Sequence, residues 1–96
     1  MGAQGSATID FGAFPGKSDA ATTVSAVGIA DADLAEAWIR PVASADHSAD
    51  EHLVETIRFH AIAVGGFAVI AVQAFNTGSG NTRIYGVWNF NWVWNA

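Results

Sequence analysis

The segment GVWNFNWVWNA, residues 86–96, constrains the fold of this chain more than any other feature. Aromatic side chains occupy every second position, and asparagine or valine stands between them. Successive side chains of a β-strand point to opposite faces, so the pattern predicts a strand with one aromatic face and one face rich in asparagine. The residues of interest on the two faces are Trp88, Asn89, Phe90, Asn91, Trp92 and Trp94.

Three different roles would use this aromatic face. Buried between two sheets it would form the core, where each ring contributes roughly 1.5–3 kcal/mol or more. Exposed, it would form a subunit interface or a platform for a sugar. We expect the core, with the interface and the ligand platform as alternatives. Asparagine is uncommon within strands, so Asn89 and Asn91 indicate that a neighbouring copy or a ligand hydroxyl uses their amides.

Period-two alternation and glycine-rich turns run through the rest of the chain. Residues 7–13 and 56–64 alternate, residues 20–29 are rich in threonine and valine, and residues 67–75 are apolar on both faces, as in a central or covered strand. The glycine pair at 65–66 predicts a two-residue hairpin. The pattern therefore predicts an all-β fold, an antiparallel β-sandwich of about six strands whose last three form a meander.

Two segments depart from this regularity. Residues 1–6 are small and polar and predict a flexible N-terminal arm, which leaves residues 7–96 as a single β-sandwich domain. Residues 31–40 contain good helix formers, and Asp33 with Glu36 resembles a capping box. A helix and a strand therefore both remain open for residues 31–40.

The composition limits the classes of partner. The chain has 96 residues, a net charge of −5 and no cysteine, so disulfides and thiolate metal sites are excluded. Its four basic residues are scattered, which argues against nucleic acid and against an anionic membrane surface. Residues 61–75 are too short a run for a membrane helix. Only 14% of the residues are charged and 51% are hydrophobic, so we expect the chain to bind copies of itself.

The stretch DHSADEH carries most of the potential chemistry. Its ionisable residues are Asp46, His47, Asp50, Glu51 and His52. Such a set would suit a divalent cation, but the spacing matches no zinc or calcium signature, and we expect no bound metal. Ser48 and Glu51 form a capping-box pair that predicts one turn of helix up to Val54. We therefore interpret the stretch as a solvated acidic loop, with docking to a basic partner as its candidate function.

No motif for catalysis accompanies this stretch. The chain lacks a G-x-S-x-G elbow, a phosphate-binding loop and a cysteine nucleophile. We therefore predict that the protein is not an enzyme, has no catalytic residues and needs no cofactor. A small metal-dependent enzyme is the third and last of the functional hypotheses.

Three segments carry a resemblance to a group of small, mostly uncharacterised proteins encoded by tailed bacteriophages, and the resemblance covers nearly the whole chain. They are TIDFGAFPGKSDA, AEAWIRPVASADHSADEH and GVWNFNWVW. The layout IRFHAIAVGGFAVIAVQAFNT followed by RIYGVWNFNWVW is also similar to the last three strands of H-type lectin-like sandwiches. These resemblances imply a six-stranded β-sandwich, a trimer and a place in a virus particle, and they favour a strand over residues 34–40.

The first hypothesis is a non-enzymatic structural protein of a tailed-phage particle, which self-associates on the capsid, as a decoration protein, or on the tail. The resemblance implies a virion location after assembly in the host cytoplasm, with copies of itself and other virion proteins as partners. The alternative is a carbohydrate-binding adhesin, a receptor-binding module with an H-type lectin-like fold and a glycan ligand. The chain lacks the strand-end polar cluster with which those lectins hold sugar, so no sugar site is transferred.

Overall fold

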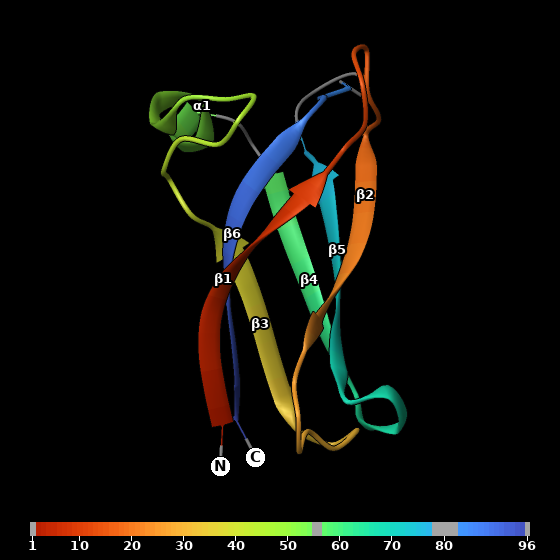
Figure 1. The fold of residues 1–96 in the computed structure, drawn as a ribbon. Helices are drawn as coiled ribbons and strands as arrows, with labels where there is room; N and C mark the ends of the chain where they lie inside the picture. Colours follow the sequence, from red (N-terminus) through yellow and green to blue (C-terminus); the bar gives the residue numbers. More distant parts are fainter. Residues whose placement is uncertain (1, 55–56, 78–82, 96) are drawn as a thin grey trace.

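The computed structural model describes residues 2–54, 57–77 and 83–95, and it confirms the all-β expectation. Six antiparallel strands form two three-stranded sheets that pack as a β-sandwich (Figure 1). One sheet has the order β1–β6–β3, formed by Gly2–Asp10, Val87–Asn95 and Leu34–Ile39. The other has the order β2–β5–β4, formed by Asp19–Ser25, Val69–Asn76 and Ile57–Val64.

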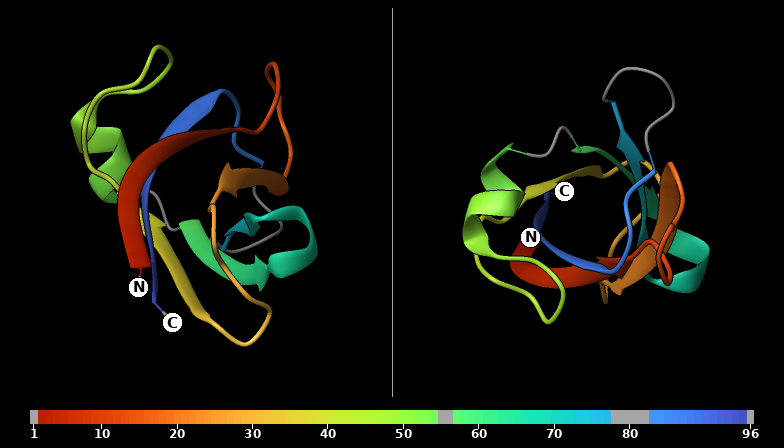
Figure 2. Two further views of the ribbon diagram at one scale, coloured as in Figure 1. Left: turned by 60° about the horizontal axis from the view of Figure 1, so that its bottom comes forward. Right: turned by 90° about the horizontal axis from the view of Figure 1, so that it is seen from above.

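The two sheets curve around one shared core. Seen along the strands, they close most of a ring, with β3 beside β4 on one side and β1 beside β2 on the other (Figure 2). The N- and C-terminal strands pair directly, since Gly2 lies opposite Asn95 (Figure 1). This pairing places β6 in the middle of its sheet, with β1 and β3 as its neighbours.

The aromatic face of β6 points inward because the neighbouring strands offer small side chains. Trp92 lies in register between Gly5 of β1 and Ala37 of β3, and Trp94 lies between two alanines in the same way. A Cβ atom on Gly5 would stand 2.8 Å from the ring of Trp92, closer than side chains tolerate. Residues 2–6 therefore form the first half of β1 rather than a flexible arm, because their small size lets the strand lie against indole rings.

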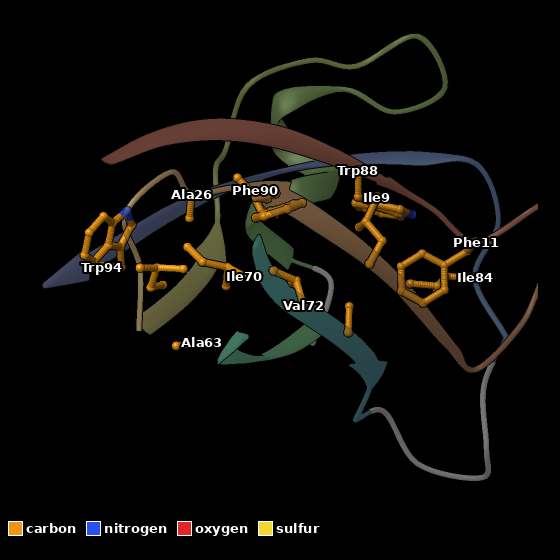
Figure 3. Close-up of a cluster of buried hydrophobic side chains, with 13 residues drawn as sticks. Ile9, Phe11, Ala26, Ala63, Ile70, Val72, Ile84, Trp88, Phe90 and Trp94 are labelled. Atoms are coloured by element: carbon orange, nitrogen blue, oxygen red, sulfur yellow. The ribbon is translucent and has the colours of Figure 1, made fainter. Parts of the chain in front are cut away.

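Three rings of the aromatic face of β6 lie in the hydrophobic core between the sheets (Figure 3). Trp88, Phe90 and Trp94 are each no more than 3% exposed, whereas Trp92 is partly buried and packs against this cluster. The buried hydrophobic residues are Ile9, Phe11, Val24, Ala26, Ile29, Ala63, Ile70, Val72, Ala74, Ile84, Trp88, Phe90 and Trp94. The interface and ligand-platform alternatives therefore do not apply to the three buried rings.

The contested segment is a strand. Leu34–Ile39 form β3, in which exposed and partly buried residues alternate, and its inward residues include Ala35 and Ala37. Asp33 does not begin a helix, since its Oδ2 accepts a hydrogen bond from the backbone N–H of Ala30 at 2.7 Å. Pairing with β6 therefore outweighs the helix propensity of this segment.

The meander expected for the last three strands is wrong. β4 and β5 do form a hairpin, with the 3-10 helix η1, Gly65–Phe67, and Ala68 between them in place of a two-residue turn. β6 belongs to the other sheet. The reason is that β5 already has β2 and β4 as neighbours, and β1 and β3 supply the small residues that the rings of β6 require.

The described part of the chain contains one α-helix, α1, Ala49–Val54, which lies beside the start of β6 (Figure 1). The predicted capping box is present. The N–H of Glu51 donates to Oγ of Ser48 at 3.2 Å, and the N–H of Ser48 donates to Oε1 of Glu51 at 2.9 Å. No described helix is long and apolar enough to cross a membrane.

Candidate functional site

The stretch DHSADEH belongs to a clamp segment, residues 42–52, which lies beside a part of β6 that β3 does not reach. β3 pairs with β6 only as far as Ile39, opposite Phe90. Arg40 then donates its backbone N–H to the carbonyl of Asn89 at 3.0 Å. The backbone groups of β6 beyond this point therefore need other partners on that side.

Side chains of the clamp segment satisfy these backbone groups. The N–H of Val87 donates to Oδ2 of Asp46 at 2.7 Å, and the carbonyl of Val87 accepts from Oγ of Ser44 at 2.6 Å. The N–H of Asn89 donates to Nε2 of His52 at 3.0 Å. Polar side chains thus take the place of a longer β3. The bonds made by Ser44 and His52 are partly buried, and a buried backbone group without a partner costs roughly 1–3 kcal/mol.

The side chain of Asn89 strengthens the same junction. Its Nδ2 donates to the carbonyl of Val42 at 2.9 Å and to that of Ala43 at 3.2 Å. The sequence predicted that a neighbouring copy or a ligand would bind the amide of Asn89. In the structure this amide binds the chain's own backbone instead. Asn91 lies further along β6, in register between Ser6 of β1 and Trp38 of β3.

His52 is 1% exposed, and both of its ring nitrogens have a defined partner. Because Nε2 accepts the N–H of Asn89, it carries no hydrogen, and Nδ1 donates to the carbonyl of Ser48 at 2.8 Å. The hydrogen-bond partners thus select one neutral tautomer. Neither nitrogen is free to bind a metal ion or to exchange a proton with a substrate.

His47 joins α1 to the core. It is 5% exposed and stacks on the indole of Trp88, with ring centroids 3.8 Å apart and an angle of 21° between the planes. Its Nδ1 lies 3.0 Å from Oε2 of Glu51, and its Nε2 contacts the carbonyl of Tyr85. The hydrogen bond with His47 is the main cause that lowers the pKa of the Glu51 carboxyl, and the backbone N–H of Ser48 adds to it.

Most of the candidate docking loop is thus engaged in the fold. Asp46, His47, Glu51 and His52 each bond within the chain, and Asp50 is exposed on α1. Among the residues that the structure describes, no group of three or more histidine, cysteine, aspartate or glutamate side chains is placed to hold a metal ion. Asp46 and Glu51 keep an exposed edge, so docking to a basic partner stays a prediction.

The outer face of the β1–β6–β3 sheet carries a polar hollow around Trp38, a residue with no site role predicted from the sequence. Trp38 is 45% exposed, and Asn91 lies in register between it and Ser6. Nη1 of Arg40 donates to Oγ of Ser6 at 3.3 Å. The hollow has a volume of about 350 Å³ and is lined by Gln4, Gly5, Ser6, Trp38, Arg40, Asn91 and Trp92.

This hollow has the chemistry of a small polar binding site. An exposed indole can stack on the apolar face of a sugar ring, while neighbouring amide, hydroxyl and guanidinium groups bind its hydroxyls. Part of the signal was present in the sequence, because Trp38 alternates with Ala35 and Ala37 and so points away from them. The strand order that brings Ser6 and Asn91 next to Trp38 was not.

A second hollow lies on the outer face of the β2–β5–β4 sheet and is mostly apolar. Its volume is about 510 Å³, and its lining residues are Ala21, Thr22, Thr23, His60, Ile62, Ala71, Val72 and Gln73. Ile62 is 66% exposed there. Among these lining residues no acid and base stand together, so the hollow offers a surface for contact rather than a site for chemistry.

Comparison with known proteins gives no further guide to these surfaces. No protein-family model matches the chain, and no curated protein and no solved structure matches it significantly. The phage and lectin resemblances therefore stay predictions.

Proposed function

We propose that this chain is a non-enzymatic structural protein that self-associates in a tailed-phage particle, on the capsid or on the tail surface. The observation that carries the proposal is the contrast between engaged polar groups and uncovered apolar surface. The histidines and carboxylates that resembled a site hold β6 in place, whereas the β2–β5–β4 sheet presents apolar side chains such as Ile62 to solvent. Exposed apolar surface of this kind is typical of proteins that bind other proteins.

The resemblance to small tailed-phage proteins supports the location in a virus particle. Copies of the chain and other virion proteins would be its partners. The low charged fraction, 14%, supports this role, because a chain that works within an assembly needs less charge to stay soluble than one that works alone.

The test is whether the chain travels with assembled particles. Phage particles purified by density-gradient centrifugation should contain it at a constant ratio to the main capsid protein, measured by quantitative mass spectrometry. Gold-labelled antibodies raised against the purified chain should then mark either the capsid or the tail in electron micrographs. A chain that remains in the soluble fraction of infected cells and is absent from intact particles would refute the virion role.

A second candidate, a carbohydrate-binding adhesin, is favoured by the hollow around Trp38. The indole would stack on a sugar ring while Arg40, Ser6 and Asn91 bind its hydroxyls. Glycan-array binding by the purified chain should be lost in Trp38→Ala and kept in Leu34→Ala, a control on the same face of the same strand. Absence of binding by the unmodified chain rejects this candidate.

A further inference from the structure

The outer face of the β2–β5–β4 sheet is largely apolar along its central strand. The residues of β5 that point away from the core are Val69, Ala71, Gln73 and Phe75, in alternation with the buried Ile70, Val72 and Ala74. No described helix or strand covers this outer face (Figure 2). Strands that are apolar on both faces are typical of sheets that are covered on both sides. The face therefore lacks a cover within one chain.

The side chains on this face are larger along one edge than along the other, so one edge stands high and the other low. β4 presents the larger side chains Arg58, His60, Ile62 and Val64, and β2 presents the smaller Asp19, Ala21, Thr23 and Ser25. In register, Ile62 and Thr23 stand on either side of Ala71. The hollow of about 510 Å³ lies between these two edges.

A two-fold rotation about an axis parallel to β5 matches this shape to itself. It exchanges the β4 side of one copy with the β2 side of the other, so the high edge of each copy lies over the low edge of the other. Ile62 of each copy then lies over Thr23 of the other copy and enters its hollow. Such a contact is isologous, because both copies contribute the same residues. Sheets packed face to face stand about 10 Å apart, which leaves room for both layers of side chains.

The charges at one end of the face follow the same symmetry. Asp19 and Arg58 flank Phe75 in register, so the rotation sets Asp19 of each copy opposite Arg58 of the other. Within the described part of one chain, neither residue forms an ion pair. Lys17 and Arg83 border a separate hollow with Asp19 but do not pair with it. The face is thus complementary to itself in charge as well as in shape.

We infer that the outer face of the β2–β5–β4 sheet binds a second copy of this chain about a two-fold axis parallel to β5. The inference rests on the self-association in the proposed function, and it names the surface and the symmetry of that contact. It differs from the trimer that the sequence resemblance implies, because a face with one high and one low edge matches itself under a two-fold rotation. The hollow around Trp38 lies on the other sheet and stays open in such a pair.

The first test compares Ile62→Glu with Leu34→Glu. The two side chains are 66% and 73% exposed and lie on opposite sheets. Sedimentation equilibrium of the unmodified chain should show a two-chain species that dissociates on dilution. Ile62→Glu should raise its dissociation constant roughly 30-fold or more, because the contact would bury an unpaired carboxylate, while Leu34→Glu should leave it unchanged. Far-ultraviolet circular dichroism verifies that both variants fold.

The second test reverses the charges. Arg58→Asp sets carboxylates opposite each other across the axis and should weaken the pair roughly tenfold. Asp19→Arg should weaken it in the same way, by setting two guanidinium groups together. The double variant, with Asp19→Arg and Arg58→Asp in one chain, should recover most of the affinity, because the rotation again joins opposite charges.

The outcomes of these tests distinguish the two-fold contact from the proposed role in the virus particle. A chain that sediments as a single copy up to about 1 mM overturns the inference, and so does a pair that survives Ile62→Glu unchanged. If Leu34→Glu rather than Ile62→Glu dissociates the assembly, self-association stands and this surface is wrong. Presence in purified particles is measured independently, so failure of the two-fold pair is distinguishable from failure of the virion role.

Discussion

The two sheets of this sandwich complete their outer surfaces in different ways. Around Trp38 the β1–β6–β3 sheet presents amide, hydroxyl and guanidinium groups, and where β3 ends the clamp segment supplies hydrogen bonds to β6. The β2–β5–β4 sheet presents Ile62, Ala71 and other apolar side chains, and no described segment covers them. In this chain the ionisable cluster therefore stabilises the fold, and the plain apolar face is the better candidate for contact with a partner.

The largest expected effect lies where the clamp segment meets the core. Trp88→Ala removes an indole that is 1% exposed and that supports the stacked ring of His47. It should lower the free energy of unfolding by roughly 3–5 kcal/mol, measured by urea denaturation. Trp92→Ala, at a partly buried position of the same strand, should cost less. Equal losses in the two variants would contradict the special position of Trp88.

Two glycines with positive φ allow a controlled test of the bond that the clamp segment makes to β6. Gly86 has a φ of 78° and Gly12 a φ of 94°. A Cβ on Gly86 would stand 2.6 Å from Oδ2 of Asp46, whereas a Cβ on Gly12 meets nothing within 4 Å. Gly12→Ala should cost about 1–2 kcal/mol from backbone strain, and Gly86→Ala roughly 2–4 kcal/mol, because Asp46 must also leave the N–H of Val87.

Thermal and urea denaturation of both glycine variants measure this difference. A similar loss in the two variants would mean that the contact between Asp46 and Val87 contributes nothing beyond the backbone conformation.

A pair of histidine substitutions compares the clamp segment, which bonds to the β1–β6–β3 sheet, with the outer face of the other sheet. His52→Phe keeps an aromatic ring but leaves the N–H of Asn89 without its partner. The carbonyl of Ser48 loses the bond from the imidazole and keeps the longer one from the backbone N–H of residue 52, at 3.3 Å. The substitution should cost roughly 1–3 kcal/mol in urea denaturation. His60→Phe makes the same change on the exposed face of the other sheet and should stay within about 0.5 kcal/mol when measured on the single chain. The reverse order would refute the stabilising role of His52.

The smallest effect concerns Glu51 and acid. The hydrogen bond with His47 lowers its pKa in the folded chain below the ordinary value of 4.5. The carboxylate therefore stabilises the fold above pH 4.5, and this contribution is lost as the pH falls through the folded pKa. Glu51→Gln should lower the Tm slightly at pH 6 and flatten the fall of the Tm in acid. Asp50→Asn, its neighbour on α1, should reproduce the curve of the unmodified chain.

Periodicity was enough to predict which side chains of β6 point inward, but not which strands become its neighbours. The alternation around Trp88 and Phe90 is local and could be read directly. The position of β6 between β1 and β3 depends on small residues such as Gly5 and Ala37, which face Trp92 across two different pairings. A flexible arm and half of a strand look alike when the residues are small, and only the match with the indole rings distinguishes them.

The clamp segment shows the same limit for the candidate site. The capping box of Ser48 and Glu51 was predictable because its partners are three residues apart. His52 and Asp46 act on backbone N–H groups 37 and 41 residues away, and no spacing within DHSADEH records those partners. Side chains that bind a distant backbone have the same composition as those of a solvated acidic loop or a metal site, so the sequence did not indicate the backbone role.

Because of the clamp segment, neighbouring backbone amides of β6 should exchange their hydrogens at different rates. Successive N–H groups of an antiparallel strand point to opposite sides, so those of Val87 and Asn89 face the clamp segment while that of Trp88 faces β1. A local opening that releases Asp46 and His52 would expose the first two amides and leave the third protected. Deuterium would then enter alternate positions of β6 at different rates, and a single spectrum would record loop opening and sheet unfolding as separate events.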